Sequence, residues 1–387
     1  MEDLVRGDAR LVPQVARISD DERALRAEVR EFLAEKRAAG RFEPTVDSWL
    51  SGWDEDFSRE LAARGWLGMT IPVEYGGRGR SFGERFAVVE ELLAAGAPVA
   101  AHWIADRQIA PSLLAYGTEE QKQAYLPRIA AGEGYWGIGM SEPNSGSDLA
   151  SVRTRAERVD GGWRVSGNKV WTSGAHHAHA FIVLARSAPV DPEHRHAGLS
   201  QFIVEFAQEG VDVRPIVSMN GSHHFNEVFL DNVFVPDDRA FGEIGSGWKQ
   251  VTSELGYERS GPERLLSTFP LLAELAESAR TGHVEADADL GCLVARIAGL
   301  HQMSMAVSGA LERHEPADVA AAVVKVLGTT TEGDIADYAD LRVGDDVDDR
   351  TLTALTARAV DQRPGFTLRG GTNEVLRGVI ARGLGLR

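Results

Sequence analysis

Small polar side chains crowd one stretch of this 387-residue sequence, SEPNSGSD at residues 141–148. Its three serines bring hydroxyls, Pro143 removes one backbone donor, and Gly146 lets the backbone approach a ligand closely. Free N–H groups and hydroxyls in such a loop suit an anionic or carbonyl-rich ligand. The stretch therefore predicts a ligand-binding loop, with an ordinary polar loop as the alternative.

A second stretch, GNKVWTSGA at residues 167–175, places an aromatic plane beside two hydroxyls. We expect a turn at Gly167 to lead into Trp171, Thr172 and Ser173. The indole would cover one face of a flat heteroaromatic cofactor while the hydroxyls bond its edge. A core tryptophan next to a polar loop is the alternative, and spacing alone does not separate the two.

Together the two stretches resemble the flavin-binding signature of the acyl-CoA dehydrogenase family. The resemblance continues in three further blocks, in the family's order: GWLGMTIPVEYGGRG (65–79), YGTEEQKQAYLPRIAAGE (116–133) and GGTNEVLRGVIARGLG (370–385). Because it covers nearly the whole chain, the protein is identified as a member of this family. The family fold is α+β and mostly α, with a middle antiparallel β domain between an N-terminal and a C-terminal helical bundle.

The residue patterns agree with that architecture. In DDERALRAEVREFLAEKRAAG (20–40), Leu25, Val29, Phe32 and Leu33 recur at helical spacing, and an acidic first turn follows Ser19. From 135 to 236 the chain reads as short β-branched or aromatic strands: WRVSGNKVW, AFIVLARS, LSQFIVEF, VDVRPI and NEVFLDNVFVP.

Helical spacing returns after residue 247, and Pro262 and Pro270 are expected to end or kink helices there. The changes of pattern predict an N-terminal helical domain at 1–134, a middle β domain at 135–240 and a C-terminal helical domain at 241–387.

Composition narrows the class of protein. Asp and Glu number 58 against 41 Lys and Arg, and the net charge of −17 argues against nucleic-acid or anionic-membrane partners. We see no signal peptide and no run of about 18 apolar residues, which predicts a cytoplasmic protein. Cys292, the single cysteine, lies in an apolar run and is expected to be buried. His176, His177, His179 and His223-His224 lack Cys or carboxylate partners at ligand spacing, so no metal site is predicted.

The resemblance implies a flavoprotein oxidoreductase that holds FAD between the β domain and the C-terminal helices. An acyl thioester, carried by CoA or by an acyl carrier protein, would lie across the flavin. A carboxylate removes the α proton and the β hydrogen leaves as hydride. Because the α proton is weakly acidic, the enolate charge needs hydrogen-bond donors, and burial brings a glutamate's pKa closer to the operating pH. The family also implies an oligomer and an electron-transfer flavoprotein or similar acceptor.

The base is expected at an unusual position. Many family members carry it in a Glu-Gly-Thr sequence near the C-terminus, which here reads GGT at 370–372. A minority place it in a Leu-x-x-Glu-Arg pattern after the β domain, and Glu258 matches that pattern. Gly370 would then donate only its backbone N–H to the thioester oxygen. Tyr257 and Arg259 are assigned to the substrate site, Arg259 mainly by fixing the helix. The alternative for Glu258 is a surface carboxylate paired with a nearby arginine.

The resemblance assigns the cofactor contacts residue by residue. Residues of the first loop should contact the flavin, and residues of the second loop should flank its ring. Residues of the C-terminal block should reach the pyrophosphate or ribose of the cofactor. In that order the residues are Met140, Ser141, Gly146 and Ser147; Trp171, Thr172 and Ser173; Thr372 and Glu374. Ser147 is also expected near the acyl chain.

Two departures from the family concern assembly. The family's Arg-x-x-Phe-Gly stretch is replaced by HVEADADLGCLVAR (283–296), and its Gln-x-x-Gly-Gly-x-Gly turn by YADLRVGDDVDDR (338–350). In the family both motifs grip the adenine end of FAD bound by the neighbouring subunit, and aspartates would repel it. A homo-oligomer would lack this grip, which favours a hetero-oligomer. A subunit that only completes a partner's flavin site and a flavin oxidase or monooxygenase of the same fold remain alternatives.

Overall fold

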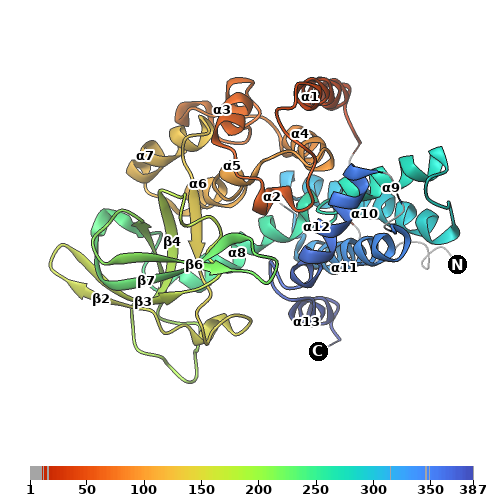
Figure 1. Ribbon diagram of the computed structural model, residues 1–387. Coiled ribbons are helices and arrows are strands. Elements are labelled where there is room, and N and C mark those ends of the chain that lie inside the picture. Colours follow the sequence, from red (N-terminus) through yellow and green to blue (C-terminus); the bar gives the residue numbers. More distant parts are fainter. Residues whose placement is uncertain are drawn as a thin grey trace, which may run out of the picture. The chain divides into compact units, whose positions relative to one another are not determined.

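The computed structural model describes residues 11, 13–14, 17–313, 315–344, 347 and 349–386, and of residues 254–260 it describes the backbone alone. The chain forms two compact units from interleaved segments (Figure 1). The helical unit comprises Met1–Trp53, Arg80–Val99 and Gly256–Arg387, and the sheet unit comprises Asp54–Gly79 and Ala100–Leu255. The predicted domain boundaries follow changes of secondary structure along the chain, and they stay predictions.

The first helices of the helical unit follow the predicted pattern. They are α1 (Asp20–Ala38), α2 (Ser48–Ser51) and α4 (Phe82–Ala94). Leu25, Val29, Phe32 and Leu33 are all buried, and Ser19 forms a capping box with Glu22 at the start of α1. Helix α4 packs against α1 and carries the buried Glu91, which accepts hydrogen bonds from arginines of α1 at 2.7–3.0 Å.

The C-terminal helices of this unit are arranged around α11. They are α9 (Phe269–Thr281), α10 (Ala288–Glu312), α11 (Asp318–Arg342), α12 (Arg350–Phe366) and α13 (Asn373–Gly383). Helix α11 packs against the other four. The helical segment is interrupted at both prolines, as predicted, and each proline starts the element that follows: Pro262 begins the short 3₁₀ turn η5 (Pro262–Arg264), and Pro270 lies in the first turn of α9.

Helix α10 differs from what its sequence predicted. Its length and composition would suffice to cross a membrane, although core helices have the same length and composition. It packs against α4 and α11 with one side, and its opposite side is exposed. Cys292 lies on the exposed side, so the prediction that it is buried was wrong. A mostly apolar sequence does not show which face of the helix is covered by other elements.

The sheet unit begins with helices. They are α3 (Glu55–Ala63), the 3₁₀ turn η1 (Val73–Tyr75), α5 (Ala100–Ile104), the π-turn η2 (Ala105–Ile109), α6 (Ala110–Tyr116) and α7 (Glu119–Ala130). Ile109, Leu113 and Ile129 of this layer pack on the sheet residues Trp136 and Ile182. The helices therefore cover one face of the sheet.

One sheet contains all the strands that this unit forms in the described residues. They are β1 (Trp136–Gly139), β2 (Arg155–Val159), β3 (Gly162–Lys169), β4 (Ala180–Arg186), β5 (Leu199–Glu205), β6 (Val211–Val217), β7 (His223–Pro236) and β8 (Ala240–Phe241). The strand order is β6-β7-β3-β2-β4-β5-β8, with β1 paired to β4. Pairing is antiparallel, as predicted, except that β1 and β2 each pair with β4 in parallel.

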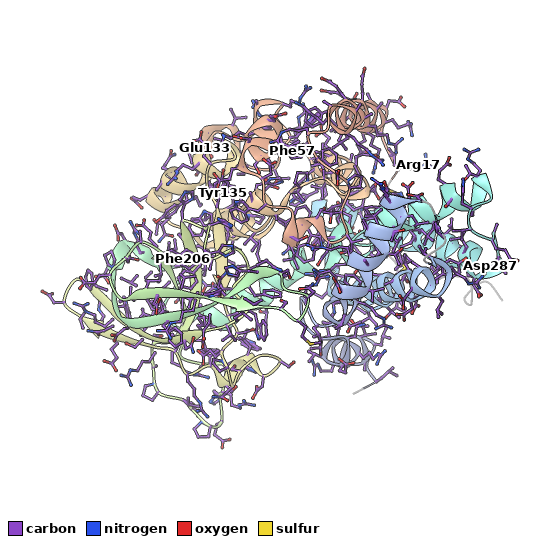
Figure 2. The ribbon with its side chains drawn as sticks, viewed as in Figure 1. Arg17, Phe57, Glu133, Tyr135, Phe206 and Asp287 are labelled. Atoms are coloured by element: carbon purple, nitrogen blue, oxygen red, sulfur yellow. The ribbon has the colours of Figure 1, made fainter. Side chains whose placement is uncertain are left out.

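Two aromatic contacts lie close to the short strand β1, one just before it in the chain and one on the neighbouring strand β4. Tyr135, labelled in Figure 2, stacks on His179 at 5.2 Å, and its hydroxyl donates to the Gly132 carbonyl at 2.8 Å. Phe206, also labelled, stacks on Phe181 at 4.4 Å. Strand β1 leads directly into the SEPNSGSD loop, and its pairing with β4, which ends at Gly139 and Val183, sets where that loop begins.

Candidate active site

The two predicted motif loops lie side by side in the sheet unit. The Val170 N–H donates to the Ser141 carbonyl at 2.9 Å, and the Lys169 ammonium donates to the Met140 carbonyl at 3.1 Å. These bonds join the end of β1 to the end of β3 across nearly thirty residues of sequence. The structure therefore places the starts of the two motif loops next to each other, while the assignment of their residues to the flavin stays a prediction.

A buried ion pair beneath the loops was not predicted. Lys169 is 0% exposed and donates to Glu142 Oε1 at 2.9 Å. The same carboxylate accepts the N–H groups of Arg153 at 2.7 Å and Thr154 at 2.8 Å. Such a pair, with its remaining lone pairs satisfied, fixes the geometry of the loops it joins.

Burial affects the two partners differently. It lowers the pKa of the Lys169 ammonium to about 8, although Glu142 opposes this shift. Burial alone would raise the pKa of Glu142, but the charge of Lys169 and the hydrogen bonds from Thr154 and Arg153 outweigh it, so that pKa is lowered. Glu142 thus stays ionised at neutral pH. A charged residue in a strand reads as solvent-facing by default, which is why the sequence gave no signal for Lys169.

The predicted turn at Gly167 is absent. Gly167 lies within β3, at a bulge in its pairing with β7. A Cβ at this position would meet Thr154 Oγ1 at 2.2 Å and its Cα at 2.7 Å. Glycine is needed here for close backbone approach rather than for a turn, and the turn prediction was wrong.

Trp171 combines an exposed side chain with a strained backbone. Its φ angle is +61°, in the left-handed region that bulky residues rarely adopt, and its side chain is 57% exposed. The flanking residues enforce this conformation, because Thr172 and Asn226 exchange two backbone hydrogen bonds at 3.0 and 3.1 Å. Phe225 meets the indole edge-on at 5.5 Å. An enforced outlier that presents an apolar ring to solvent indicates a functional position.

The neighbouring residues offer polar groups of different accessibility. Thr172 is fully buried, and its hydroxyl has no hydrogen-bond partner among the described residues. Ser173 is half-buried, and Ser147 is exposed. A Cβ at Gly146 would meet nothing within 4 Å, so the loop is open there. An open indole face with hydroxyls around it fits a flat heteroaromatic ring whose edge carries hydrogen-bonding atoms, as FAD has.

Histidines gather behind the Trp171 loop. The His176 ring stacks on His223 at 4.1 Å and lies 4.0 Å from the His177 ring. Asn226 joins two of them, at 3.0 Å to His176 Nδ1 and 2.9 Å to His223 Nε2. Among the described residues, no three His, Cys, Asp or Glu side chains are arranged to hold a metal ion. Loss of hydration, together with the charges of the neighbouring histidines, lowers the pKa of His176 to about 4.

The C-terminal motif lies in the helical unit. Gly370 and Gly371 both have positive φ, at 65° and 85°, a conformation that glycine adopts without strain. Thr372 caps α13 by accepting the Val375 N–H at 3.3 Å. The Glu374 N–H and the Thr372 hydroxyl hold the pKa of the Glu374 carboxyl below its ordinary value. An ionised carboxylate here suits a ribose hydroxyl better than a pyrophosphate.

The predicted catalytic residue lies on helix α8 (Gly247–Ser260). Glu258, Tyr257 and Arg259 belong to its last turn, and their side chains lie outside the described part of the chain. Each unit is described by itself, so the approach of Glu258 and Gly370 to Trp171 stays a prediction.

Comparisons with known proteins show similarity to acyl-CoA dehydrogenases. Residues 19–133 match the model of the acyl-CoA dehydrogenase N-terminal domain, and residues 137–233 match that of the middle domain. The acyl-CoA dehydrogenase IpdE1 of Mycolicibacterium smegmatis is 33% identical over 93% of this chain and 97% of its own length. Acyl-CoA dehydrogenase FadE34 of Mycobacterium tuberculosis is 36% identical over 84% of this chain, which spans 45% of that relative's length. The chain also spans 63% of the length of IpdE1 of M. tuberculosis.

Two solved structures are similar over almost the whole chain. The Tcur3481-Tcur3483 steroid ACAD has a TM-score of 0.85 and 30% identity, covering 96% of this chain and 99% of that one. The ChsE4-ChsE5 complex from M. tuberculosis has a TM-score of 0.79 and 31% identity, covering 96% and 100%. The matched motif loops, the two family models and the full-length similarity to IpdE1 together show that this chain belongs to the acyl-CoA dehydrogenase family.

Proposed function

We propose that this chain catalyses the FAD-dependent α,β-dehydrogenation of an acyl thioester. The observation that carries the proposal is Trp171, an exposed indole in a strained conformation beside the SEPNSGSD loop. The buried Glu142–Lys169 pair holds that loop in place before any ligand arrives. FAD, when bound there, supplies the acceptor for the β hydride.

Glu258 is the proposed base for the α proton. The chain offers no carboxylate at residue 370, where the family's more common base would be, and Glu258 matches the alternative position. The Gly370 N–H would donate to the thioester carbonyl oxygen and stabilise the charge that develops on it, as an oxyanion hole does. Tyr257 and Arg259 share the last turn of α8 with Glu258, and we assign them to the substrate site, Arg259 mainly by fixing the helix.

A bulky, ring-bearing acyl group is the substrate class we favour. The similar Tcur3481-Tcur3483 protein is a steroid ACAD. A glycine at 370 also occupies less volume than the glutamate that it replaces, which leaves more room near the acyl chain. Short linear acyl thioesters should therefore be poorer substrates than cyclic ones.

A homologous partner chain is part of the proposal. Asp287, labelled in Figure 2, caps α10 by accepting the Leu290 N–H at 2.9 Å and pairs with Arg342 at 2.6 Å. Asp349 caps α12 in the same way, through the Leu352 N–H at 2.9 Å. Both helix N-termini thus already carry one of the chain's own carboxylates, whose negative charge would repel a phosphate. Asp345, Asp346 and Asp348 of the second departure lie outside the described residues.

The test is anaerobic reduction of bound FAD by a panel of acyl-CoA thioesters, using this chain alone and co-expressed with homologous neighbouring genes. The proposal expects flavin bleaching by at least one thioester, with the unsaturated thioester formed in equal amount. Flavin that binds but is bleached by none of them would favour the subunit that only completes a partner's site. Rapid reoxidation by O₂ with stoichiometric peroxide would favour an oxidase.

A further inference from the structure

The turn that carries Gly370 is tied at both ends inside the helical unit. The Asn373 N–H donates to the Thr367 carbonyl at 3.1 Å. The fully buried Lys325 of α11 donates both to that carbonyl, at 3.0 Å, and to Asn373 Oδ1, at 2.8 Å. Between these ends the turn contains two consecutive glycines, which leave its peptide planes easy to rotate.

Arg369 is the side chain that restrains this flexible segment from within. Its guanidinium bonds to the carboxylate of Asp47, which is 1% exposed. Two rings lie over it, Trp49 at 4.8 Å and Phe366 at 5.4 Å. Asp47 is itself anchored, because its N–H donates to the Ser267 carbonyl at 2.9 Å. An arginine held by a carboxylate and two aromatic rings has little freedom left.

A second carboxyl lies beneath the pair. Glu332 of α11 is 0% exposed and accepts the Ser267 N–H at 2.7 Å, while its other oxygen has no partner among the described residues. Burial raises the pKa of Glu332 to about 7, and Arg369 acts against that rise. Such a polar cluster is costly to bury unless it serves an ordered arrangement.

We propose that Arg369, held by Asp47, is a positioning residue that aims the Gly370 N–H at the thioester carbonyl. The inference rests on the proposed function. Arg369 directly precedes Gly370, and the peptide group between them carries the Gly370 N–H. The contacts of the Arg369 guanidinium therefore limit how far this peptide group can rotate. Without them the turn would keep its tied ends, while the Gly370 N–H would sample several directions. Loss of direction in one oxyanion donor lowers the rate of the chemical step more than substrate binding.

The test compares four single variants and the double variant Arg369→Gln/Asp47→Asn with the wild type, all purified with FAD and any required partner. Arg369→Gln and Asp47→Asn each remove one charge, and asparagine tolerates the positive φ of residue 47. Arg369→Lys keeps the cation. Arg363→Gln is the matched control, because Arg363 of α12 pairs with Asp337 on the exposed surface of the same unit.

We expect kcat to fall about 10- to 100-fold in Arg369→Gln and Asp47→Asn, with KM within about 2-fold and FAD content unchanged. The double variant Arg369→Gln/Asp47→Asn should be no slower than the slower of its two single variants, and Arg369→Lys should recover part of the rate. Hydrogen exchange of the peptide containing residues 368–374 should be faster in both charge-removing variants and unchanged in Arg363→Gln.

Equal kcat and equal exchange in Arg369→Gln and wild type would overturn the proposal. A fall in stability without a selective fall in kcat would do so as well, since it indicates a purely structural ion pair. If the wild type reduces no thioester, the proposed function fails, and the exchange experiment alone decides whether Arg369 orders the turn.

Discussion

At the scale of single residues, Trp171 carries most of the evidence for a cofactor. A tryptophan with φ of +61° costs conformational energy, and an indole that is 57% exposed gains little from burial within its own unit. The hydrogen bonds between Thr172 and Asn226 hold the chain in this conformation. A ligand that covers the indole would explain why both costs are tolerated.

Two substitutions at this position separate strain from ligand binding. Trp171→Ala and Trp171→Gly should both release FAD more readily and change flavin fluorescence. Glycine adopts φ of +61° without the cost of about 1–2 kcal/mol that alanine bears, so the glycine variant should melt at a higher temperature than the alanine variant. Fluorescence titration and thermal melts measure the two effects. Unchanged FAD affinity in both variants would place the indole away from the flavin.

His176 gives the sheet unit a dependence on pH. Its pKa is about 4 in the folded protein and about 6.5 in an unfolded chain. Between these values the unfolded chain binds a proton that the folded chain does not, so stability should fall as pH drops from about 6.5 towards 4. Melting temperatures of wild type and His176→Gln across pH 4.5–8 should show a shallower decline in the variant. His194→Gln, on an exposed loop, is the control, and equal slopes in all three proteins would contradict the assignment.

The motif loops could be located from the sequence because family motifs are local, but the buried charged residues that hold these loops could not. Glu142 and Lys169 are 27 positions apart, and Asp47 and Arg369 are 322 apart. Each of these residues reads alone as an ordinary surface charge, and only the fold shows that it is buried. The prediction of a turn at Gly167 was wrong for a related reason. In a sequence, a glycine needed for close packing in a strand cannot be told from a glycine needed for a turn.

At the scale of elements, the sequence located segments better than their partners. The spacing of Leu25, Val29 and Phe32 is local, and it predicted both α1 and its buried face. The four-residue strand β1 gave no pattern of its own, and its parallel pairing with β4 joins segments more than forty residues apart. The exposed side of α10 was likewise invisible, because hydropathy does not show how many faces a helix buries.

The Glu142–Lys169 pair is the element-scale prediction, since it joins the SEPNSGSD loop to β3. Glu142→Gln leaves a buried ammonium without its counter-charge and should cost about 3–5 kcal/mol of unfolding free energy. The double variant Glu142→Gln/Lys169→Met removes both charges and should be less destabilised than Glu142→Gln alone. Denaturant unfolding of the sheet unit, followed by its tryptophan fluorescence, measures this.

The control for that experiment is Asp148→Asn, which breaks an exposed ion pair with Arg195 in the same loop. Its effect should stay within about 1 kcal/mol. If Glu142→Gln were as stable as Asp148→Asn, the buried pair would not be what holds the loop. The FAD affinity of Glu142→Gln should then also match that of the wild type.

At the scale of the whole molecule, the central question is which chain grips the adenine end of FAD. Asp287 and Asp349 cap the helices that follow the two departures from the family pattern. Expressed alone, the chain should hold FAD weakly or substoichiometrically, and a homologous partner with an intact Arg-x-x-Phe-Gly motif should restore tight binding. Flavin absorbance per chain and the mass of the complex in solution measure this. A stable homotetramer with one FAD per chain would show that other residues grip the adenine end.

The most direct test of the proposed reaction is the rate of anaerobic flavin bleaching in Glu258→Gln, with a thioester that first reduces the wild type. Glutamine keeps the shape of the side chain and removes its basicity, so substrate should still bind. Bleaching should slow by about 10²–10⁴-fold, and Gly370→Glu in the same background should recover part of the rate. Glu277→Gln, an exposed change on α9, should bleach as fast as wild type. If the thioester bleaches the flavin of Glu258→Gln as fast as that of the wild type, another residue removes the α proton, and the proposed role of Glu258 is wrong.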